Sequence, residues 1–394
     1  MKVLLYRYGS ICEPDLILGL KSLGLEVLEY TREMTKKDYG PAECVRELSE
    51  YLQDKPVDFV MSINFFPTVS MVCQIFKLRY LTWIVDAPVM ELYTSAITNE
   101  VNRVFIFDRA LYNDIHPLNP TGVFHLPLAA NVASKKKLFS ESSEKTKQKY
   151  THDIAFVGSL YTEKCPYDRA KDLPASTRGY FDAIMRAQER VYGFYFIEEL
   201  LEDKHIEDFK NHINGFYTLP GDNYLTDRRT LAQLYIGNKI TAMERVDTFK
   251  ELSKRFEIDI YTASDTSGIP GLRNRGLAKT LTEMPIIFNR AGININMTSK
   301  PIRTGLPLRI FDILSCEGFL ISNYQEEISE LFVPGEEIVM YGSIEELSDL
   351  CAYYLEHKKE SREIARCGYE KLAANYTYEK QLERMFEMAF GDIV

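Results

Sequence analysis

The chain has 394 residues, of which 45% are hydrophobic and 26% charged, and its formal net charge is -10. This balance is typical of a globular protein long enough for two domains, and the acidic charge excludes an overall basic surface for nucleic acid. No run approaches the roughly 18 apolar residues of a membrane-spanning helix, and the start MKVLLYRYGS turns polar too early for a signal peptide. We therefore expect a cytoplasmic location.

Strand and helix patterns alternate through the first third of the chain. Short apolar runs predict strands at 2–6, 26–30, 58–63, 80–85, 104–107 and 123–126, with helical patterns between most of them. This alternation predicts a parallel sheet that is covered on both faces, as the first domain, 1–133. Ligand sites in such sheets lie beyond the carboxyl ends of the strands. The polar residues expected there are Gly9, Ser10, Asn64, Asp86 and Asp108.

Two aspartates in this domain follow apolar strand patterns. Asp86 comes three residues after Trp83, the only tryptophan. Its carboxylate could act as a general base on a hydroxyl, bind a sugar, or cap the following helix, and the sequence leaves these alternatives open. For Asp108 helix capping is favoured. His125 lies in an apolar strand pattern and is expected to be a satisfied core histidine rather than a catalyst.

The composition changes abruptly at 134–150, SKKKLFSESSEKTKQKY, a charged and serine-rich stretch that predicts a linker over 134–152. A second alternating series predicts the second domain, 153–376, and a final helix at 377–394. Its strands are expected at 153–157, 258–261, 286–288, 319–322 and 337–340. A helical insertion at about 170–240 is rich in tyrosine and phenylalanine. Core packing of these rings is favoured over stacking on sugars or an oligomeric surface.

The stretch 304–322 is the most informative part of the sequence. It combines a loop containing Gly305 and Pro307, a short helix, a glycine stop and a buried strand. Arg309 lies in the first turn of that helix, and Asp312 follows on the same face because positions i and i+3 are neighbours. An arginine for phosphate beside a carboxylate for sugar hydroxyls predicts a nucleotide-sugar pocket. The alternative is a surface ion pair at a helix start.

Weaker signals accompany this pair. Gly158 and Ser159 end a strand pattern where backbone could approach a ligand, although an ordinary tight turn would look the same. The polar stretch 294–303 leads into the loop; Lys300 and Arg303 could add positive charge there, or its polar side chains could simply satisfy turn backbone. Seven cysteines without CxxC spacing and six histidines without HxxxH spacing predict no metal site, and there is no GxGxxG fingerprint.

Longer blocks of the sequence resemble a known bacterial family. MPIIFNRAGININMTSKPIRTGLPLRIFDILSCEGFLISNYQEEISELF, followed by VPGEEIVMY and YGSIEEL, resembles the glycosyltransferase domain of the CgeB-like, spore maturation protein type glycosyltransferases. VDFVMSINFFPTVSMVCQIFKLRYLTWIVDAPVMELY, with VFIFD after it, resembles the N-terminal domain of the same family. The two matches leave mainly 134–256 uncovered, and the resemblance is specific because several long blocks occur in the right order.

The resemblance implies a GT-B fold, in which two facing Rossmann-like, doubly wound domains are followed by a C-terminal helix that packs back toward the N-terminal domain. It also implies metal-independent transfer of a sugar from a nucleoside-diphosphate sugar, most often UDP-linked, on the C-terminal domain. The acceptor, a glycan or a surface protein, would lie on the N-terminal domain. Alternatives are a nucleotide-sugar epimerase of the same fold and a non-catalytic nucleotide- or sugar-binding protein. A homo-oligomer through the aromatic helical region is a further possibility.

Site roles follow from the same resemblance. Related retaining enzymes carry two glutamates eight residues apart at this loop, and the second, which binds the donor ribose, corresponds to Asp312. The first corresponds to Thr304, which is not acidic, so the sequence departs from the two-glutamate pattern and leaves open whether the sugar is transferred with retention or inversion. Arg309 would stabilise the diphosphate. The predicted donor-binding residues are Gly158, Ser159, Thr262, Asn296, Arg303, Gly305, Pro307, Leu308, Arg309 and Asp312; Asp86 and Arg309 are the predicted catalytic residues.

Overall fold

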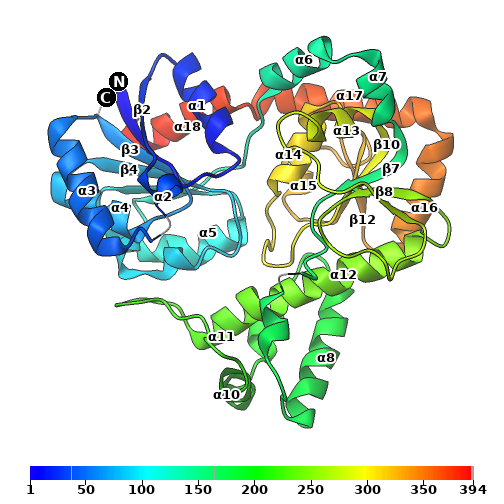
Figure 1. Ribbon diagram of the computed structural model, residues 1–394, viewed down its shortest axis with the longest axis horizontal. Helices are drawn as coiled ribbons and strands as arrows, with labels where there is room; N and C mark the ends of the chain where they lie inside the picture. Colours follow the sequence, from blue (N-terminus) through cyan, green and yellow to red (C-terminus); the bar gives the residue numbers. More distant parts are fainter. Residues whose placement is uncertain (37, 164, 392–394) are drawn as a thin grey trace. The chain divides into compact units, whose positions relative to one another are not determined.

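The computed structural model describes residues 1–36, 38–163 and 165–391 and divides into two compact units (Figure 1). Unit 1 comprises Met1–Asn131, the short segment Leu219–Leu225 and the end of the chain from Asn375. Unit 2 comprises Val132–Thr218 and Thr226–Ala374. In the described part of the chain, no helix is both long and apolar enough to cross a membrane.

Unit 1 is built on a six-stranded parallel sheet in the order β2-β1-β3-β4-β5-β6. The chain moves outward from β1 to β2 and then returns to β3 on the other side, so the switch point of this sheet lies between β1 and β3. The strands are β1 (Lys2–Tyr6), β2 (Glu26–Tyr30), β3 (Phe59–Ile63), β4 (Arg79–Ile84), β5 (Asn102–Ile106) and β6 (Val123–His125). They confirm the six apolar runs predicted for the first domain.

The helices of unit 1 cover both faces of its sheet. They are α1 (Glu13–Ser22), α2 (Arg32–Thr35), α3 (Pro41–Asp54), α4 (Pro67–Phe76), α5 (Arg109–Ile115) and α18 (Tyr378–Phe390), with short 3₁₀ turns η1 (Met90–Tyr93), η2 (Ser95–Thr98) and η3 (His116–Leu118). Asp108 caps α5, since its carboxylate accepts hydrogen bonds from the amides of Ala110 (2.9 Å) and Leu111 (3.3 Å). The predicted capping role of Asp108 is therefore confirmed.

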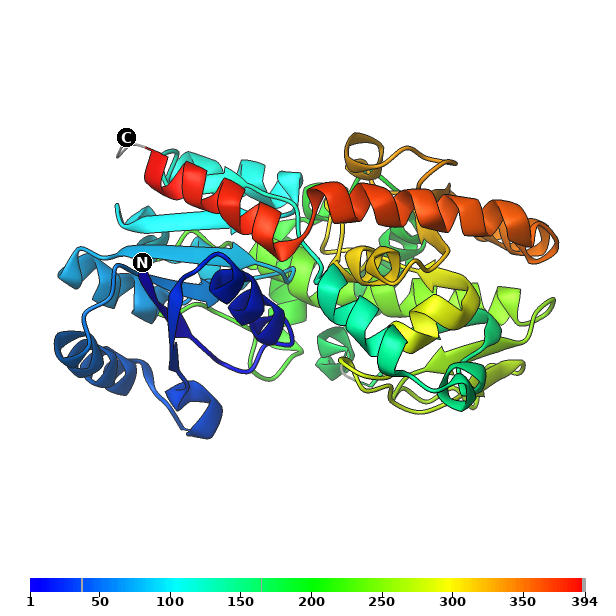
Figure 2. The same cartoon turned by 90° about the horizontal axis from the view of Figure 1, so that it is seen from above.

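The last helix of the chain belongs to the first unit. Figure 2 shows α18, in red, beside α1, in dark blue. The rings of Phe386 and Phe390 lie 5.7 and 5.4 Å from that of Phe59 in β3. At Gly19 of α1, an added Cβ would lie 3.0 Å from the side chain of Leu382. The apolar face of α18 thus closes the core of unit 1, in agreement with the predicted return of the C-terminal helix.

Unit 2 is built on a second six-stranded parallel sheet in the order β12-β11-β10-β7-β8-β9. From β7 the chain forms β8 and β9 on one side and then crosses to β10 on the other, so the switch point lies between β7 and β10. The strands are β7 (His152–Val157), β8 (Ile258–Tyr261), β9 (Leu272–Asn274), β10 (Ala291–Asn296), β11 (Leu320–Asn323) and β12 (Val339–Tyr341).

The helices of unit 2 include those of the inserted region between β7 and β8. They are α6 (Val132–Glu141), α7 (Glu144–Lys149), η4 (Pro166–Arg169), α8 (Ala175–Glu189), α9 (Ile197–Leu200), α10 (Asp203–Asn211), α11 (Asp227–Thr230), the π-helical turn η5 (Leu231–Ile236), α12 (Gly237–Leu252), α13 (Met284–Arg290), α14 (Leu308–Ser315), α15 (Ile328–Leu331), α16 (Ile344–Glu356) and α17 (Lys358–Asn375). The stretch 134–150, whose composition suggests a linker, forms α6 and α7.

One strand prediction in unit 2 is wrong, and two strands, β9 and β10, were missed. The run 286–288, predicted as a strand, lies in α13, which begins with a proline at its first turn. The central strand β10 instead includes Asn294 and Asn296, which the polar pattern places in a loop. Both are buried, and their amide groups bond within the protein, Asn294 to the carbonyls of Phe288 (2.9 Å) and Phe319 (3.1 Å). Two buried asparagines, whose side-chain amides donate within the protein, thus hid the strand.

The aromatic-rich helices of unit 2 have a hydrophobic core of their own. Phe181, Phe209 and Tyr235 are fully buried there, and the rings of Phe209 and Tyr235 lie 5.0 Å apart. Aromatic rings of this size dominate the packing of a small helical cluster. The prediction that the tyrosines and phenylalanines form the core of an inserted helical region is confirmed.

A seven-residue segment, Leu219–Leu225, leaves this helical region and is part of unit 1. Its backbone pairs with the turns after β4: the amide of Ser95 donates to the carbonyl of Asp222 (3.0 Å), and the amide of Tyr224 donates to that of Tyr93 (2.7 Å). Leu219 and Leu225 pack against the core of unit 1. Main-chain pairing and apolar contacts together fix this segment to unit 1.

Candidate functional site

The candidate site of unit 2 lies where its parallel strands end at the switch point. Gly158 and Ser159 follow β7, and Met297 and Thr298 follow β10. In open α/β sheets, the crevice outside the carboxyl ends at this point is the usual place for a ligand. The sequence placed the first two residues there, but it missed the second strand end because β10 was not recognised.

Arg245 of α12 joins the two strand ends. Its guanidinium donates to the carbonyl of Ser159 (2.5 Å) and to that of Met297 (2.6 Å). The side chain is buried, with the ring centroids of Tyr161 and Phe156 4.8 and 5.6 Å from the guanidinium carbon. One buried arginine therefore sets the spacing of the loops after β7 and β10.

The charge of Arg245 is not matched by a nearby carboxylate. No carboxylate oxygen of a described residue lies within 4.0 Å of it. Burial lowers the pKa of Arg245, and the positive charge of Arg309 acts in the same direction, whereas Tyr161 and Glu244 oppose it. A buried guanidinium without a carboxylate partner beside a switch point favours a bound anion, because the anion offsets the cost of burying its charge.

Arg309 lies in the first turn of α14, directly after the loop that leaves β10. Its guanidinium is 3.6 Å from the Asp312 carboxylate, 2.9 Å from the sulfur of Met284, and 5.2 Å from the ring centroid of Phe288. Burial lowers the pKa of Arg309, and Asp312 opposes this effect. The spacing of the arginine and the aspartate thus produces a real contact on one helix face, with the guanidinium held between α14 and α13.

The loop after β7 forms a hydrogen-bonded network of its own. The hydroxyls of Ser159 (2.9 Å) and Ser264 (2.7 Å) donate to the carboxylate of Glu163, and Thr262 donates to Ser264 (3.0 Å). Burial acts to raise the pKa of Glu163, but the hydrogen bonds outweigh it and hold that pKa below its usual value. Ser159 and Thr262, both predicted donor-site residues, are therefore joined through Glu163 and Ser264.

The amides of this loop are largely used within the protein. Gly158 donates to the carbonyl of Tyr261 (3.1 Å), and Leu160 donates to the hydroxyl of Ser264 (2.8 Å). A Cβ at Gly158 would lie 3.2 Å from the Phe156 ring. Close packing thus accounts for this glycine, and its amide serves the sheet rather than an open anion cradle.

The loop between β10 and α14 contains the remaining predicted residues. Asn296 is buried, and its amide donates to the hydroxyls of Thr298 (3.0 Å) and Ser322 (2.9 Å). Arg303 is half-buried beside a small hollow that is also lined by Tyr192 and Lys300. Further along, Gly305 is buried, Pro307 is the extended residue before α14, and Leu308 is its first residue. Arg303, Gly305 and Pro307 belong to the loop that leads into α14 at Leu308, whereas Asn296 is the last residue of β10, before this loop.

A carboxylate lies beside Thr304, the position where the related enzymes carry their first glutamate. The hydroxyl of Thr304 donates to Glu327 (2.8 Å), and the amide of Glu327 donates to the carbonyl of Thr304 (3.2 Å). Glu327 is 1% exposed and precedes α15. The sequence could not indicate this residue, because it is 23 positions away in the chain.

In unit 1, the predicted catalytic Asp86 belongs to a polar group at the ends of three strands. Its exposed carboxylate accepts a hydrogen bond from the side-chain amide of Asn64 (2.7 Å), which also donates to the hydroxyl of Tyr8 (3.0 Å). Burial raises the pKa of Tyr8 to about 12, and the charge of Asp86 contributes. Asp86 is therefore held by a neighbouring strand end, and the 3₁₀ turn that follows has no side-chain cap.

Glu13 is a structural residue that sequence reasoning missed. One oxygen of its fully buried carboxylate accepts hydrogen bonds from the amides of Tyr8 (2.9 Å), Gly9 (3.0 Å) and Ser10 (3.1 Å), and Arg7 donates to the other (2.8 Å). Consecutive amides of this kind bind anions. Because the carboxylate of Glu13 already occupies them, the loop after β1 offers no amide cradle to a phosphate.

Replacing Arg245 with lysine is expected to lower the free energy of unfolding by about 1–3 kcal/mol, because an ammonium cannot serve both carbonyls and leaves one without its donor. Thermal and urea unfolding measure the effect. Arg255→Lys, at an exposed arginine just after α12, is the matched control and should change little. Equal stability of the two variants would show that the Arg245 bridge does not hold the loops.

Comparison with known proteins places this site in context. Residues 245–387, less than half of the chain, match the model of a family described as glycosyl transferase-like. The matched range begins at Arg245 and includes Arg309 and Asp312. None of the curated proteins matches the chain.

Several solved structures are similar along the whole chain. An Anabaena protein, HepE, in complex with UDP-glucose has a TM-score of 0.57 at 9% identity and covers 98% of each chain. Sucrose-phosphate synthase from Thermosynechococcus elongatus has a TM-score of 0.56 at 9% identity and covers 100% of each. A glycosyltransferase from Rickettsia africae has a TM-score of 0.52 at 11% identity and covers 99% of this chain and 98% of that one. The two parallel sheets with their helices thus match GT-B glycosyltransferase structures, which confirms the predicted fold class.

Proposed function

We propose that this protein is a glycosyltransferase that moves a sugar from a nucleoside-diphosphate sugar to a hydroxyl acceptor. The observation that carries the proposal is the contact between Arg309 and Asp312 on α14, directly after the loop that leaves β10 at the switch point of the unit 2 sheet. A diphosphate is an anion that such a site would bind. Both residues lie in the range that matches the glycosyl transferase-like family.

The proposed donor is UDP-linked, because HepE, which has the same fold, binds UDP-glucose. Asp312 would accept hydrogen bonds from ribose hydroxyls, while Arg309, whose guanidinium lies 3.6 Å from the Asp312 carboxylate, would contact the diphosphate. Arg245 would act as a positioning residue that keeps the loops after β7 and β10 at a fixed distance. The donor would be bordered by Gly158, Ser159, Thr262 and the loop from Arg303 to Leu308. These residues would not supply the main positive charge that meets the diphosphate.

Catalysis would come from stabilising the leaving group. When the bond between the sugar and the diphosphate breaks, negative charge develops on the phosphate oxygens, and a fixed guanidinium stabilises it without reorganisation. We propose that arginine, rather than a divalent ion, supplies this charge. Asp86 would serve as the general base toward the acceptor hydroxyl, since its carboxylate is exposed and oriented by Asn64. The acceptor proposed is a glycan or a surface protein, as in the CgeB-like enzymes that the sequence resembles.

The donor proposal is tested by thermal unfolding with UDP and UDP-sugars. A ligand that binds only the folded protein raises its stability, by about 2.7 kcal/mol at a concentration of 100 Kd, so the melting temperature should rise with UDP. Asp312→Asn should reduce this increase, and Asp265→Asn, at an exposed loop position of the same unit, should leave it intact. If UDP and UDP-sugars leave the melting temperature unchanged, the donor assignment is wrong.

A further inference from the structure

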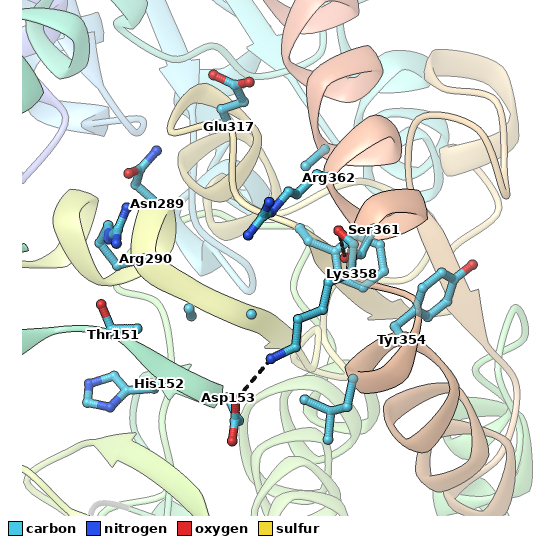
Figure 3. Close-up of a pocket in the computed structure, with 15 residues that line it drawn as sticks. Thr151, His152, Asp153, Asn289, Arg290, Glu317, Tyr354, Lys358, Ser361 and Arg362 are labelled. Carbon is cyan, nitrogen blue, oxygen red and sulfur yellow. Dashed lines mark hydrogen bonds and ion pairs between the residues drawn. The ribbon is translucent and has the colours of Figure 1, made fainter. Parts of the chain in front are cut away.

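A second pocket lies in unit 2 at the opposite edge of the sheet from the candidate donor site. Its volume is about 340 Å³, within the range of small-molecule sites. It is bordered by the first residues of β7 and β10, the turn before β11, and the beginning of α17 (Figure 3). Because these are the amino ends of the strands, the pocket is not part of the switch-point site.

The pocket has a charged side and an apolar side. Basic side chains come from two helices: Arg290 ends α13, and Lys358 and Arg362 lie in the first turns of α17. The apolar side is formed by Phe319 and Tyr354, both nearly buried. These two sides fit a small ligand whose compact anionic group meets the basic side chains and whose remaining, uncharged part lies against the apolar side.

Most of the positive charge in the pocket is not neutralised by protein acids. Lys358 lies 3.9 Å from Asp153, an ion pair at the limit of contact. In the described ranges of the chain, neither Arg290 nor Arg362 has a carboxylate oxygen within 4.0 Å. The remaining acid, Glu317, has its carboxylate directed away from the guanidinium of Arg362 (Figure 3).

The one histidine of the pocket does not change this balance. The imidazole of His152 is 3.0 Å from the Asp259 carboxylate and 2.7 Å from the hydroxyl of Tyr261. Burial lowers the pKa of His152, the nearby Asp259 opposes this, and Arg275 adds to it. The ring thus interacts with residues of β8 rather than with the pocket.

The beginning of α17 adds to the positive potential. This helix of 18 residues, Lys358–Asn375, presents its first turns to the pocket. The partial positive charge of a helix amino end acts together with the two side-chain cations on it. Ser361, on the same turn, also borders the pocket, and its hydroxyl donates to the carbonyl of Lys358 (3.3 Å).

We propose that this pocket binds a small phosphate monoester, whose phosphate lies between Arg290 and Arg362 and whose body lies against Phe319 and Tyr354. Arginine suits this ligand because its planar guanidinium donates two parallel hydrogen bonds to phosphate oxygens. Since the pocket lies at the other edge of the sheet, its ligand is not a reactant of the donor site. This site is independent of the proposed transferase activity.

Isothermal titration calorimetry with glucose 6-phosphate and with inorganic phosphate tests the proposal. We expect glucose 6-phosphate to bind more tightly than phosphate, because only the ester can contact the apolar side. The double variant Arg290→Gln/Arg362→Gln should weaken binding of both by on the order of tenfold or more. Both arginines are exposed, so the variant should keep its fold, which circular dichroism verifies.

Two controls separate this pocket from the donor site. Lys359→Gln removes a charge from the same helix turn but outside the pocket, and it should leave the affinity unchanged. Arg309→Ala changes the donor site and should also leave it unchanged. Absence of binding by either ligand at millimolar concentration would overturn the proposal. So would binding that survives the double variant or is lost in Arg309→Ala, since the anion would then lie elsewhere.

Discussion

Replacing Glu13 with alanine is expected to destabilise unit 1 by roughly 3–5 kcal/mol, since the substitution removes one partner of a buried, hydrogen-bonded charge pair. Three consecutive backbone amides would lose a fully buried acceptor, and the guanidinium of Arg7 would keep only Glu29. Glu13→Gln keeps one carbonyl oxygen for the amides and should cost less. This loop follows β1, beside the switch point of the unit 1 sheet. Losing its hydrogen bonds to Glu13 therefore weakens the unit at its centre.

The sequence provides a local reporter for this measurement. Trp83 is the only tryptophan and is fully buried in β4, so urea unfolding followed by its fluorescence reports on unit 1 rather than on the whole chain. Glu50→Ala, at an exposed position of α3, is the control and should shift the midpoint very little. A shift for Glu13→Ala no larger than that of Glu50→Ala would contradict the anchoring role of Glu13.

Replacing Arg309 with alanine is expected to reduce turnover of a UDP-sugar by a factor on the order of 10²–10³, the usual cost of losing one donor that stabilises charge developing in a transition state. Because the effect concerns the leaving diphosphate, kcat should fall more than KM rises. The release of UDP from UDP-glucose in the absence of an acceptor measures this step. Arg309→Lys should restore part of the rate, since it keeps the charge but not the planar donor pair.

The control for this experiment is Arg366→Ala, which removes an exposed arginine paired with Glu363 and Glu370 on α17. Its rate should equal that of the unmodified protein. If Arg309→Ala retained its rate while its fold was intact, Arg309 would be a structural residue held by Met284, Phe288 and Asp312, and the leaving-group role would be refuted.

The alternation of strands and helices could be predicted from sequence because parallel strands buried on both faces are continuous apolar runs. Strand β10, which the apolar pattern missed, shows where prediction from local sequence fails. Asn294 and Asn296 interrupt the apolar pattern, yet they are buried, with amide groups that donate to partners contributed by distant segments. A polar residue whose partner is far away in the chain cannot be distinguished from a loop residue by local pattern.

The candidate site was predictable to a similar extent. Arg309 and Asp312 contact each other through a spacing that any helix produces, so the pair was visible in the sequence. Arg245 was not, since its partner carbonyls belong to Ser159 and Met297, 86 and 52 positions away. On sequence alone it is one charged residue of a long helix. Only the topology, which brings β7 beside β10, gives it a position at the switch point.

The segment Leu219–Leu225 makes unit 1 the product of three separate stretches of the chain. The chain passes from one unit to the other after Asn131, Thr218, Leu225 and Ala374. The main chain of this segment is bonded to Tyr93 and Ser95, and α18 adds Phe386 and Phe390 to the core of the same unit. Unit 1 therefore forms only when residues far apart in the sequence come together, and contacts of this kind slow folding because the intervening chain must first be closed into loops.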